Sequence, residues 1–384
     1  MKSLEELRQG IDRIDKQLLE LFAERMDFCS QVADYKRSVG MPILDVQREK
    51  EVLAAKMEML KNPELKDEVY AFFSGIMAIS RNLQKQKLAD VQKEDVIQSV
   101  LSSSNARIKN PRVCYFGASG SYSEGATMEY FGTETQRFPV DSFAGVLETL
   151  TREEADYGVL PIENSSTGSI AAVLDLLGKY GCSIVGEVNL AIHHCLLGKK
   201  GTELSKISKV YSHEQGILQS QTFLNSIGSP KTEVCHSTAQ SAKLVAELED
   251  VTVAAIAGKQ NATIYGLEIL AENINSSEQN MTRFAVVAKC PEITEECDKI
   301  SIVFTLPHES GELHRVMSCF ARGGLNLLKL ESRPIPNQRF EYMFFVDYTG
   351  NLLDEKVRQV TDEVIAEAQE FKLLGNYPAG AMGE

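Results

Sequence analysis

Apolar residues recur at near-heptad spacing over the first 35 positions, which predicts one long amphipathic helix. The helix is expected from about Ser3 to Ser38, some 50 Å by rise per residue, and it ends where Gly40, Met41 and Pro42 follow. The apolar stripe consists of Leu4, Leu7, Ile11, Ile14, Leu18, Leu21, Phe28, Val32 and Tyr35. This period is typical of a helix that buries one face against other helices.

Two further helical patterns complete a helical region of about the first 92 residues. One is expected at 45–60 and stops at Asn62-Pro63, and the next at 64–89. A helix as long as the first cannot bury its stripe against two shorter ones in so small a unit. We therefore expect an obligate dimer, or a larger oligomer, with intertwined helices.

Arg25 interrupts the apolar stripe at a position where another leucine would fit. Lys36 lies eleven residues further on, about three turns, so the two cations face the same way. Arg8 is roughly 100° off that face and about 25 Å along the axis, so it is expected to serve the site of a partner chain. A cation in an apolar seam is costly unless an anion meets it. The pattern indicates a site for an anionic small molecule, with a polar residue that fixes oligomer register as the alternative.

Beyond a serine-containing linker at 93–111, short apolar runs alternate with helical patterns. Strands are expected at 113–116, 157–160, 183–185, 209–211 and 251–254. Gly, Asn and Ser follow several of them, where α/β sheets place their ligands. This alternation of strand and helix patterns predicts an α/β domain.

The last part of the chain, 299–376, has its own pattern. Strands and helices are expected in the order strand, helix, strand, strand, helix, strand, over 300–306, 313–321, 325–333, 340–348, 355–370 and the residues after it. This order is ferredoxin-like.

Composition excludes several classes of function. A net charge of −14 argues against a nucleic-acid or anionic-membrane partner. The N-terminus is charged and amphipathic, and no apolar run reaches membrane-spanning length. Eight single cysteines favour reduced thiols in the cytoplasm. His193, His194 and Cys195 are adjacent, but neighbours on a strand point to opposite faces, so no metal site is expected.

The helical region resembles the all-helical chorismate mutase family at eight positions: Arg8, Arg25, Lys36, Asp45, Arg48, Glu49, Ser80 and Gln84. The resemblance implies a cofactor-free rearrangement of chorismate to prephenate. Lys36 and Gln84 would donate to the breaking ether oxygen, and Arg25 with Arg8 of the partner subunit would bind the two carboxylates. Arg48 would support the site, Glu49 would bind the substrate hydroxyl, and Asp45 and Ser80 would complete the lining.

The glycine-rich segment 117–125 of the α/β region lacks dinucleotide spacing, and a P-loop would need Lys at Ala126. The other motifs are the segments 161–168, 212–215, 236–239 and 279–284 with its Thr-Arg-Phe triplet. In their order and content these five segments resemble prephenate dehydratases over 112–289. The resemblance implies two lobes with a periplasmic-binding-protein-like fold and a site in the cleft between them.

Residue roles follow from that resemblance. Thr282 is expected to donate a proton to the leaving hydroxyl or to relay one. Arg283 would hold a lobe or a carboxylate, with a structural salt bridge as the alternative. The other expected substrate-binding residues are Glu163, Asn164, Ser165, Thr167, Ser237, Thr238 and Phe284. Ser237 also fits an ordinary N-cap, and His213 fits a loop histidine better than a catalytic acid.

The segment Glu331-Ser332-Arg333-Pro334 resembles the effector motif of ACT regulatory domains. Its companion reads Gly311-Glu312-Leu313-His314, where the family usually has Gly-Ala-Leu-Val. Gly311, Leu313, Glu331, Ser332 and Arg333 are therefore expected to bind L-phenylalanine, with a purely dimerising domain as the alternative.

Taken together, the chain resembles bifunctional chorismate mutase–prephenate dehydratases of phenylalanine biosynthesis, which combine an isomerase and a lyase. Two rivals remain open. A mutase joined to a prephenate dehydrogenase would need a dinucleotide site, and none is visible in the sequence. A non-catalytic sensor of aromatic metabolites with a helical dimerisation module would have no need for both residue sets.

Overall fold

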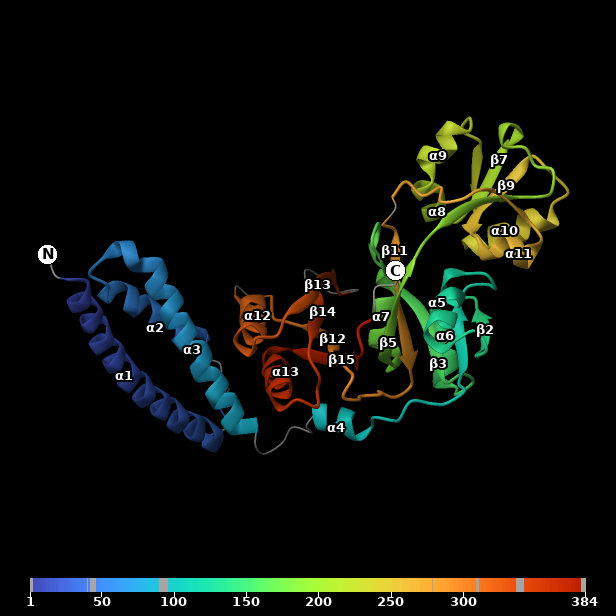
Figure 1. Ribbon diagram of the computed structural model, residues 1–384. Helices are drawn as coiled ribbons and strands as arrows, with labels where there is room; N and C mark the ends of the chain where they lie inside the picture. Colours follow the sequence, from blue (N-terminus) through green and yellow to red (C-terminus); the bar gives the residue numbers. More distant parts are fainter. Residues whose placement is uncertain are drawn as a thin grey trace. The chain divides into compact units, whose positions relative to one another are not determined.

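The computed structural model describes residues 3–39, 41, 46–89, 96–277, 279–308, 311–335 and 342–380 (Figure 1). The chain forms two compact units. The first comprises Met1–Ser99, Gly311–Cys319 and Asp362–Glu367, and the second comprises Val100–Ser310, Phe320–Thr361 and Ala368–Glu384.

The helical region of the first unit contains the three expected helices. They are α1 (Leu4–Val39), α2 (Val46–Met59) and α3 (Lys66–Ala89), the last preceded by a 3₁₀ turn at Pro63–Leu65. Both α1 and α2 pack on α3. Glu5 and Glu6 open α1 and Lys36 and Arg37 close it, which suits the helix dipole. The predicted bounds are confirmed to within two residues.

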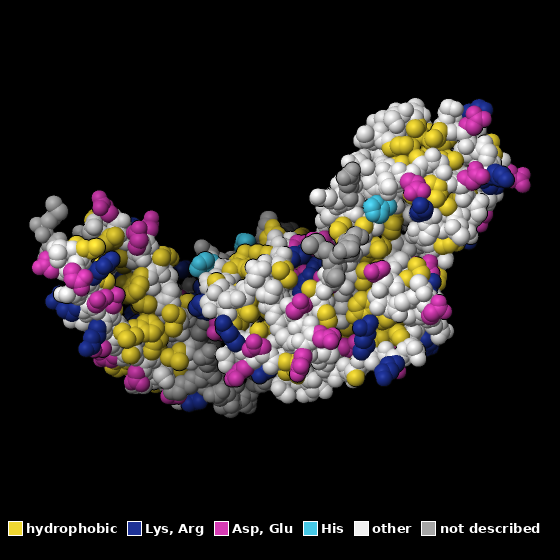
Figure 2. All heavy atoms as spheres, viewed as in Figure 1, with side chains coloured by type: hydrophobic (Ala, Val, Ile, Leu, Met, Phe, Trp, Pro, Cys, Tyr) yellow, Lys and Arg dark blue, Asp and Glu magenta, His cyan; other side chains and the backbone are white. Residues whose placement is uncertain are grey.

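The apolar stripe of α1 is largely exposed in the single chain. Leu4, Leu21 and Tyr35 each expose more than 60% of their surface. Hydrophobic side chains cover much of the visible face of this region in Figure 2. Such a surface is far larger than monomeric proteins normally leave in water.

The expected linker at 93–111 contains a short helix that the sequence analysis did not predict, α4 (Val96–Ser102). Val96, Ile97, Val100 and Leu101 place apolar groups on one side of two turns, and Ile97 is 1% exposed. Within the second unit, Asn105 N donates to Pro291 O at 2.8 Å, so the segment after α4 is fixed to the domain that it precedes.

The second unit contains a long mixed sheet and a smaller one. The long sheet has the order β13-β14-β12-β15-β5-β11-β3-β1-β2, with β4 paired to β3. Its first-lobe strands are β1 (Arg112–Phe116), β2 (Gln136–Val140), β3 (Tyr157–Asn164), β4 (Gly168–Ser169), β5 (Ser183–Ala191) and β11 (Met281–Ala288). Helix α5 (Tyr122–Phe131) covers one face, and α6 (Phe143–Thr151) and α7 (Ala171–Tyr180) cover the other.

The second lobe is built on a five-stranded sheet of order β10-β6-β9-β7-β8. Its strands are β6 (His194–Gly198), β7 (Lys209–Ser212), β8 (Lys231–Val234), β9 (Val253–Gly258) and β10 (Glu268–Ala271). Its helices are α8 (Glu214–Gln219), α9 (Gln221–Ser226), α10 (Thr238–Glu247) and α11 (Gln260–Tyr265), with a 3₁₀ turn at Leu204–Lys206. The chain crosses between the lobes after β5 and before β11, as Figure 1 shows. The two-lobed expectation is thereby met.

The C-terminal elements follow the expected β-α-β-β-α-β order. They are β12 (Lys299–Thr305), α12 (Glu312–Gly323), β13 (Leu327–Pro334), β14 (Tyr342–Thr349), α13 (Glu355–Glu367) and β15 (Glu370–Tyr377). Their sheet is continuous with that of the first lobe, because Gly375 of β15 pairs with Ile184 of β5. A Cβ at Gly375 would lie 2.2 Å from Ile184 O, so this junction needs glycine.

Among the described residues, no helix has the length and hydropathy needed to cross a membrane. All eight cysteines are free thiols.

Candidate functional site

In the helical region, Arg25 of α1 and Ser80 of α3 are in direct contact. The guanidinium Nη1 of Arg25 donates to Ser80 Oγ, which itself donates to Ile76 O at 2.7 Å. Ser80 is 5% exposed and Arg25 is half-buried. The structure therefore brings together two residues that the sequence predicted for one site. Because the contact is partly buried, the attraction between the guanidinium and a bound anion would be stronger there than in water.

A second contact joins α2 and α3 and includes a residue that sequence reasoning missed. Arg81 Nη1 forms an ion pair with Glu49 Oε1, and the Arg81 side chain is 8% exposed. Arg81 directly follows the predicted Ser80. A charged residue at this place in the helix could have been noticed from the sequence. The pair fixes the predicted Glu49 against α3.

The remaining mutase candidates are placed differently. Gln84 is buried one turn after Ser80 on the same face of α3, and its Oε1 has no hydrogen-bond partner within the described ranges. Lys36 is half-buried, whereas Arg8 is exposed on α1. Arg48 is exposed and ion-paired with Glu51 at 3.7 Å. Asp45 lies outside the described residues.

In the second unit, Thr282 and Asn164 form a pair at the ends of two neighbouring strands. They lie opposite each other in the β11–β3 ladder, and Asn164 Nδ2 donates to Thr282 Oγ1 at 2.9 Å. The same amide donates to Asn280 Oδ1 at 2.9 Å. Thr282 is 8% exposed and Asn280 is 2% exposed. The predicted Thr282 and Asn164 are thus neighbours in a nearly dry environment.

Four residues that the sequence analysis did not select extend this pair across the hinge. Asn280 Nδ2 donates to Gln219 Oε1 at 2.9 Å, and His194 Nε2 donates to the same oxygen at 3.0 Å. The Tyr122 hydroxyl donates to His193 O at 2.9 Å and also lies 2.9 Å from His194 Nδ1. Burial lowers the pKa of His194, which favours its neutral ring. Asn280 and Tyr122 lie in segments that matched the family, and His194 stood out only as part of a histidine pair, whereas Gln219 had no sequence signal.

The glycine-rich segment 117–125 lines a cavity of about 630 Å³ between the lobes. Leu190 and Tyr122 line it from the first lobe, and Lys259 and Gln260 from the second. The backbone carbonyl of Gly120 accepts from the side chains of Gln260 and Asn261, each at 2.9 Å. Gly120 has φ +84, and a Cβ there would lie 2.2 Å from Asn261 Oδ1. Glycine at this position lets the two lobes meet.

Several predicted dehydratase residues have structural contacts of their own. Ser165 Oγ donates to Gln279 O and accepts from Met281 N, each at 2.9 Å. Thr167 is exposed in the turn after β3. Ser237 is the N-cap of α10, which begins at Thr238, and His213 is the N-cap of α8. Ser237 therefore has the N-cap role that was given as its alternative, and His213 ends the loop before α8.

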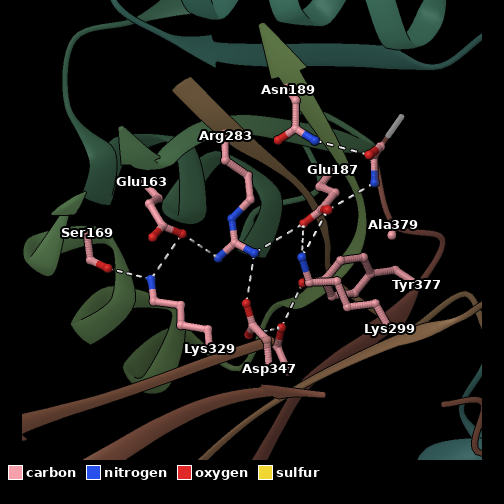
Figure 3. Close-up of polar contacts among 12 residues, drawn as sticks. Glu163, Ser169, Glu187, Asn189, Arg283, Lys299, Lys329, Asp347, Tyr377 and Ala379 are labelled. Carbon is pink, nitrogen blue, oxygen red and sulfur yellow. Dashed lines mark hydrogen bonds and ion pairs between the residues drawn. The ribbon is translucent and has the colours of Figure 1, made fainter. Parts of the chain in front are cut away.

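The side chains of the Thr-Arg-Phe triplet do not all lie on one face of the sheet, because successive side chains of a strand point to opposite faces. Phe284 is 2% exposed in the core beneath α5, where it packs, and its role as a substrate contact stays a prediction. Arg283 points to the other face, where it forms ion pairs with Glu163 at 3.1 Å and Asp347 at 2.8 Å (Figure 3). The structural salt bridge considered for Arg283 is present.

The predicted effector residues lie in both units. Gly311 precedes α12 with φ +92 and Leu313 is half-buried in its first turn. On β13, Arg333 Nη1 donates to Ala171 O at 2.5 Å and pairs with Asp175 at 2.7 Å. Glu331 pairs with Lys329 at 3.4 Å, and Ser332 is exposed.

Comparison with known proteins identifies two families along the chain. The chain matches the chorismate mutase type II family over residues 7–85 and the prephenate dehydratase family over residues 113–292. Both classes are therefore combined in one polypeptide.

Full-length relatives show the same combination. The bifunctional chorismate mutase/prephenate dehydratase of Aquifex aeolicus is 32% identical over 385 residues, covering all of both chains. The chain belongs to the family of bifunctional chorismate mutase/prephenate dehydratases.

Two solved structures resemble the later part of the chain. One is the prephenate dehydratase of Arthrobacter aurescens in complex with L-Phe, which is 28% identical with a TM-score of 0.66 over 71% of this chain and 91% of that one. The other is GqqA, described as a quorum quenching acylase, which is 26% identical with a TM-score of 0.64 over 70% of this chain and 98% of that one.

Proposed function

We propose that residues 1–92 rearrange chorismate to prephenate and that residues 112–289 convert prephenate to phenylpyruvate, with no cofactor in either step. The observation that best supports the dehydratase site is the hydrogen bond from Asn164 to the nearly buried hydroxyl of Thr282. The Arg25–Ser80 contact supports the mutase site. Family membership supports the pairing of the two activities.

The mutase reaction is a pericyclic rearrangement, so it needs no nucleophile and no proton transfer. Its rate depends on a chair-like conformer and on donors aimed at the ether oxygen, where negative charge grows. We assign Lys36 and buried Gln84 to that oxygen. Arg25, which Ser80 orients, and Arg8 of the partner subunit would bind the carboxylates. Arg48 would support the site, Asp45 and Ser80 would complete the lining, and Arg81 would hold Glu49 for the substrate hydroxyl.

The dehydratase reaction consumes one proton and releases carbon dioxide and water. The electron pair of the breaking carbon–carboxylate bond moves into the ring, and the ring hydroxyl leaves as water after gaining that proton. Thr282 Oγ1 already accepts from Asn164, so its own hydrogen is oriented to donate, and the accepted bond makes it a better donor. Carboxylate loss is favoured where water is excluded, as the burial of Asn280 and Thr282 indicates.

An assay with supplied prephenate tests the dehydratase half alone. The proposal predicts phenylpyruvate without added cofactor or metal. Binding of prephenate without any product would instead favour the sensor.

We further propose that α1 forms an intertwined dimer, which supplies Arg8 to the partner's site. The exposed apolar stripe of α1 supports this arrangement. Sedimentation at assay concentration should give a dimer or a larger assembly. A monomer that retains full mutase activity would contradict it.

The C-terminal elements are proposed to be an ACT domain that binds L-phenylalanine at Gly311, Leu313 and Glu331–Arg333. Their β-α-β-β-α-β order and the L-Phe complex of the Arthrobacter aurescens relative support this. Millimolar phenylalanine should lower dehydratase activity, and unchanged activity would reject the proposal.

A further inference from the structure

Thr282 and Arg283 are consecutive on β11, so their side chains leave opposite faces of the sheet. The same holds for Asn164 and Glu163, which pair with them on β3. One face presents the Asn164–Thr282 hydrogen bond, and the other presents the Glu163–Arg283 ion pair. A displacement of the ion pair that shifted the strands would therefore also shift the two residues assigned to the reaction.

The ion pair is not isolated, because the C-terminal elements supply its other partners (Figure 3). Asp347 of β14 contacts Arg283 at 2.8 Å, and Lys329 of β13 contacts Glu163 at 3.3 Å. Lys329 also donates to Ser169 Oγ, at the end of the turn that follows Asn164. The carboxylate of Glu163 thus lies between a cation of its own lobe and a cation of the C-terminal domain.

A second group of contacts holds the other terminal nitrogen of the Arg283 guanidinium. Glu187 of β5 lies 3.5 Å from its guanidinium and also binds Lys299 of β12 at 2.9 Å. Asp347 accepts from Ser301 Oγ at 2.6 Å. The network thus connects the cations Arg283, Lys299 and Lys329 with the carboxylates of Glu163, Glu187 and Asp347.

Burial makes this network sensitive to the loss of one member. Burial alone would raise the pKa of Asp347, but Arg283 and the Ser301 hydroxyl outweigh it and hold that pKa below its usual value. An ion pair in such surroundings is costly to break, because the remaining charge stays buried without its partner.

Lys329 also joins the network to the effector motif. Lys329, Glu331 and Arg333 alternate on β13, so they share the face that meets the first lobe. Glu331 lies 3.4 Å from Lys329 Nζ, and therefore shares the same ammonium group with Glu163. A ligand amine that paired with Glu331 would shift Lys329 toward Glu163.

We propose that Lys329 and Asp347 are positioning residues of the dehydratase site, which hold the Asn164–Thr282 pair through Glu163 and Arg283, and that Glu331 acts on this pair through Lys329. The last part rests on the proposed binding of phenylalanine. The first part rests on the contacts alone.

The test compares single and double variants by their dehydratase kcat and KM with supplied prephenate. Lys329→Met and Asp347→Asn should each lower kcat on the order of tenfold with little change in KM, because a misplaced donor affects the reacting state more than binding. Lys329→Arg should restore kcat. Lys329 is partly exposed, so Lys329→Met remains decisive if Asp347→Asn does not fold.

Lys372→Met is the matched control, since Lys372 of β15 donates to Gly178 O of α7 at 2.6 Å outside the network. It should retain the wild-type kcat. An equal loss in Lys372→Met, or wild-type kcat in Lys329→Met, would overturn the proposal.

A double-mutant cycle separates positioning from simple loss of folded protein. In an Asn164→Ala background, Lys329→Met should lower kcat no further, because the pair that it positions is already gone. Losses that multiply would overturn the proposal.

Phenylalanine titration tests the part that concerns Glu331. Inhibition of the wild type should disappear in Lys329→Met, and full inhibition of that variant would refute the role of Glu331. A wild type that phenylalanine does not inhibit would remove both the effector assignment and that role. The cycle would still decide whether Lys329 and Asp347 are positioning residues.

Discussion

The side-chain amide of Asn164 lies 2.9 Å from the hydroxyl oxygen of Thr282, although 118 positions separate the two residues in the chain. The antiparallel ladder of β3 and β11 creates this contact. A threonine that accepts one strong hydrogen bond has its own hydrogen directed elsewhere, which is the arrangement that a proton donor needs.

Removal of the amide should therefore impair the dehydratase step alone. Asn164→Ala is expected to lower dehydratase kcat by about tenfold to a hundredfold, in the usual range for a general acid that loses its orientation. Mutase activity of the same preparation serves as the control. Unchanged turnover of prephenate would show that Thr282 does not depend on Asn164.

The two proposed sites share no residue, so they should be separable by mutation. Lys36→Ala is expected to abolish turnover of chorismate and to spare turnover of supplied prephenate. Thr282→Ala should do the reverse. If either change removed both activities from a folded protein, the two-site description would be wrong.

Arg81 should matter to the mutase although it was not predicted from the sequence. Arg81→Met keeps the length of the side chain but leaves Glu49 half-buried without this cation. Because Glu49 is assigned to the substrate hydroxyl, we expect mutase KM to rise on the order of tenfold. Arg37→Met is a suitable comparison for charge, since its ion pair with Asp34 is exposed and lies outside the proposed site. A wild-type KM in Arg81→Met would remove Glu49 from the site.

The hydrogen-bonded chain through His194 predicts a dependence of stability on pH. Burial lowers the pKa of His194, so the unfolded chain binds this proton more readily than the folded one. The free energy of unfolding should therefore fall as the pH drops below the ordinary histidine pKa of about 6.5. His213, whose pKa burial also lowers, contributes in the same direction.

Urea unfolding of the wild type and of His194→Gln, followed from about pH 7.5 to about pH 5.5, measures this effect. The loss of stability over that range should be smaller in His194→Gln. Equal losses would mean that His194 does not stay neutral in the folded protein.

Local patterns in the sequence predicted the helical region well. Apolar periodicity and proline and glycine breaks place α1, α2 and α3, and the misplaced cation Arg25 does contact Ser80. The same alternation rule that places strands also separates Thr282 and Phe284 from Arg283, so the packing role of Phe284 was within reach of the sequence.

Other features depend on long-range register, which no local pattern specifies. The chain from Tyr122 through His194 and Gln219 to Asn280 joins four segments across the hinge. The junction of β15 with β5 and the contact of Asp347 with Arg283 are similar cases. These contacts arise from the way distant segments are brought together in the fold, so partners such as Gln219 and Asp347 could not be selected beforehand.

The most direct test of the whole account is to give the purified full-length protein chorismate, without cofactor, and to identify the product. The account predicts phenylpyruvate, formed through prephenate. Accumulation of prephenate alone would contradict the dehydratase assignment, and the absence of turnover would contradict both activities.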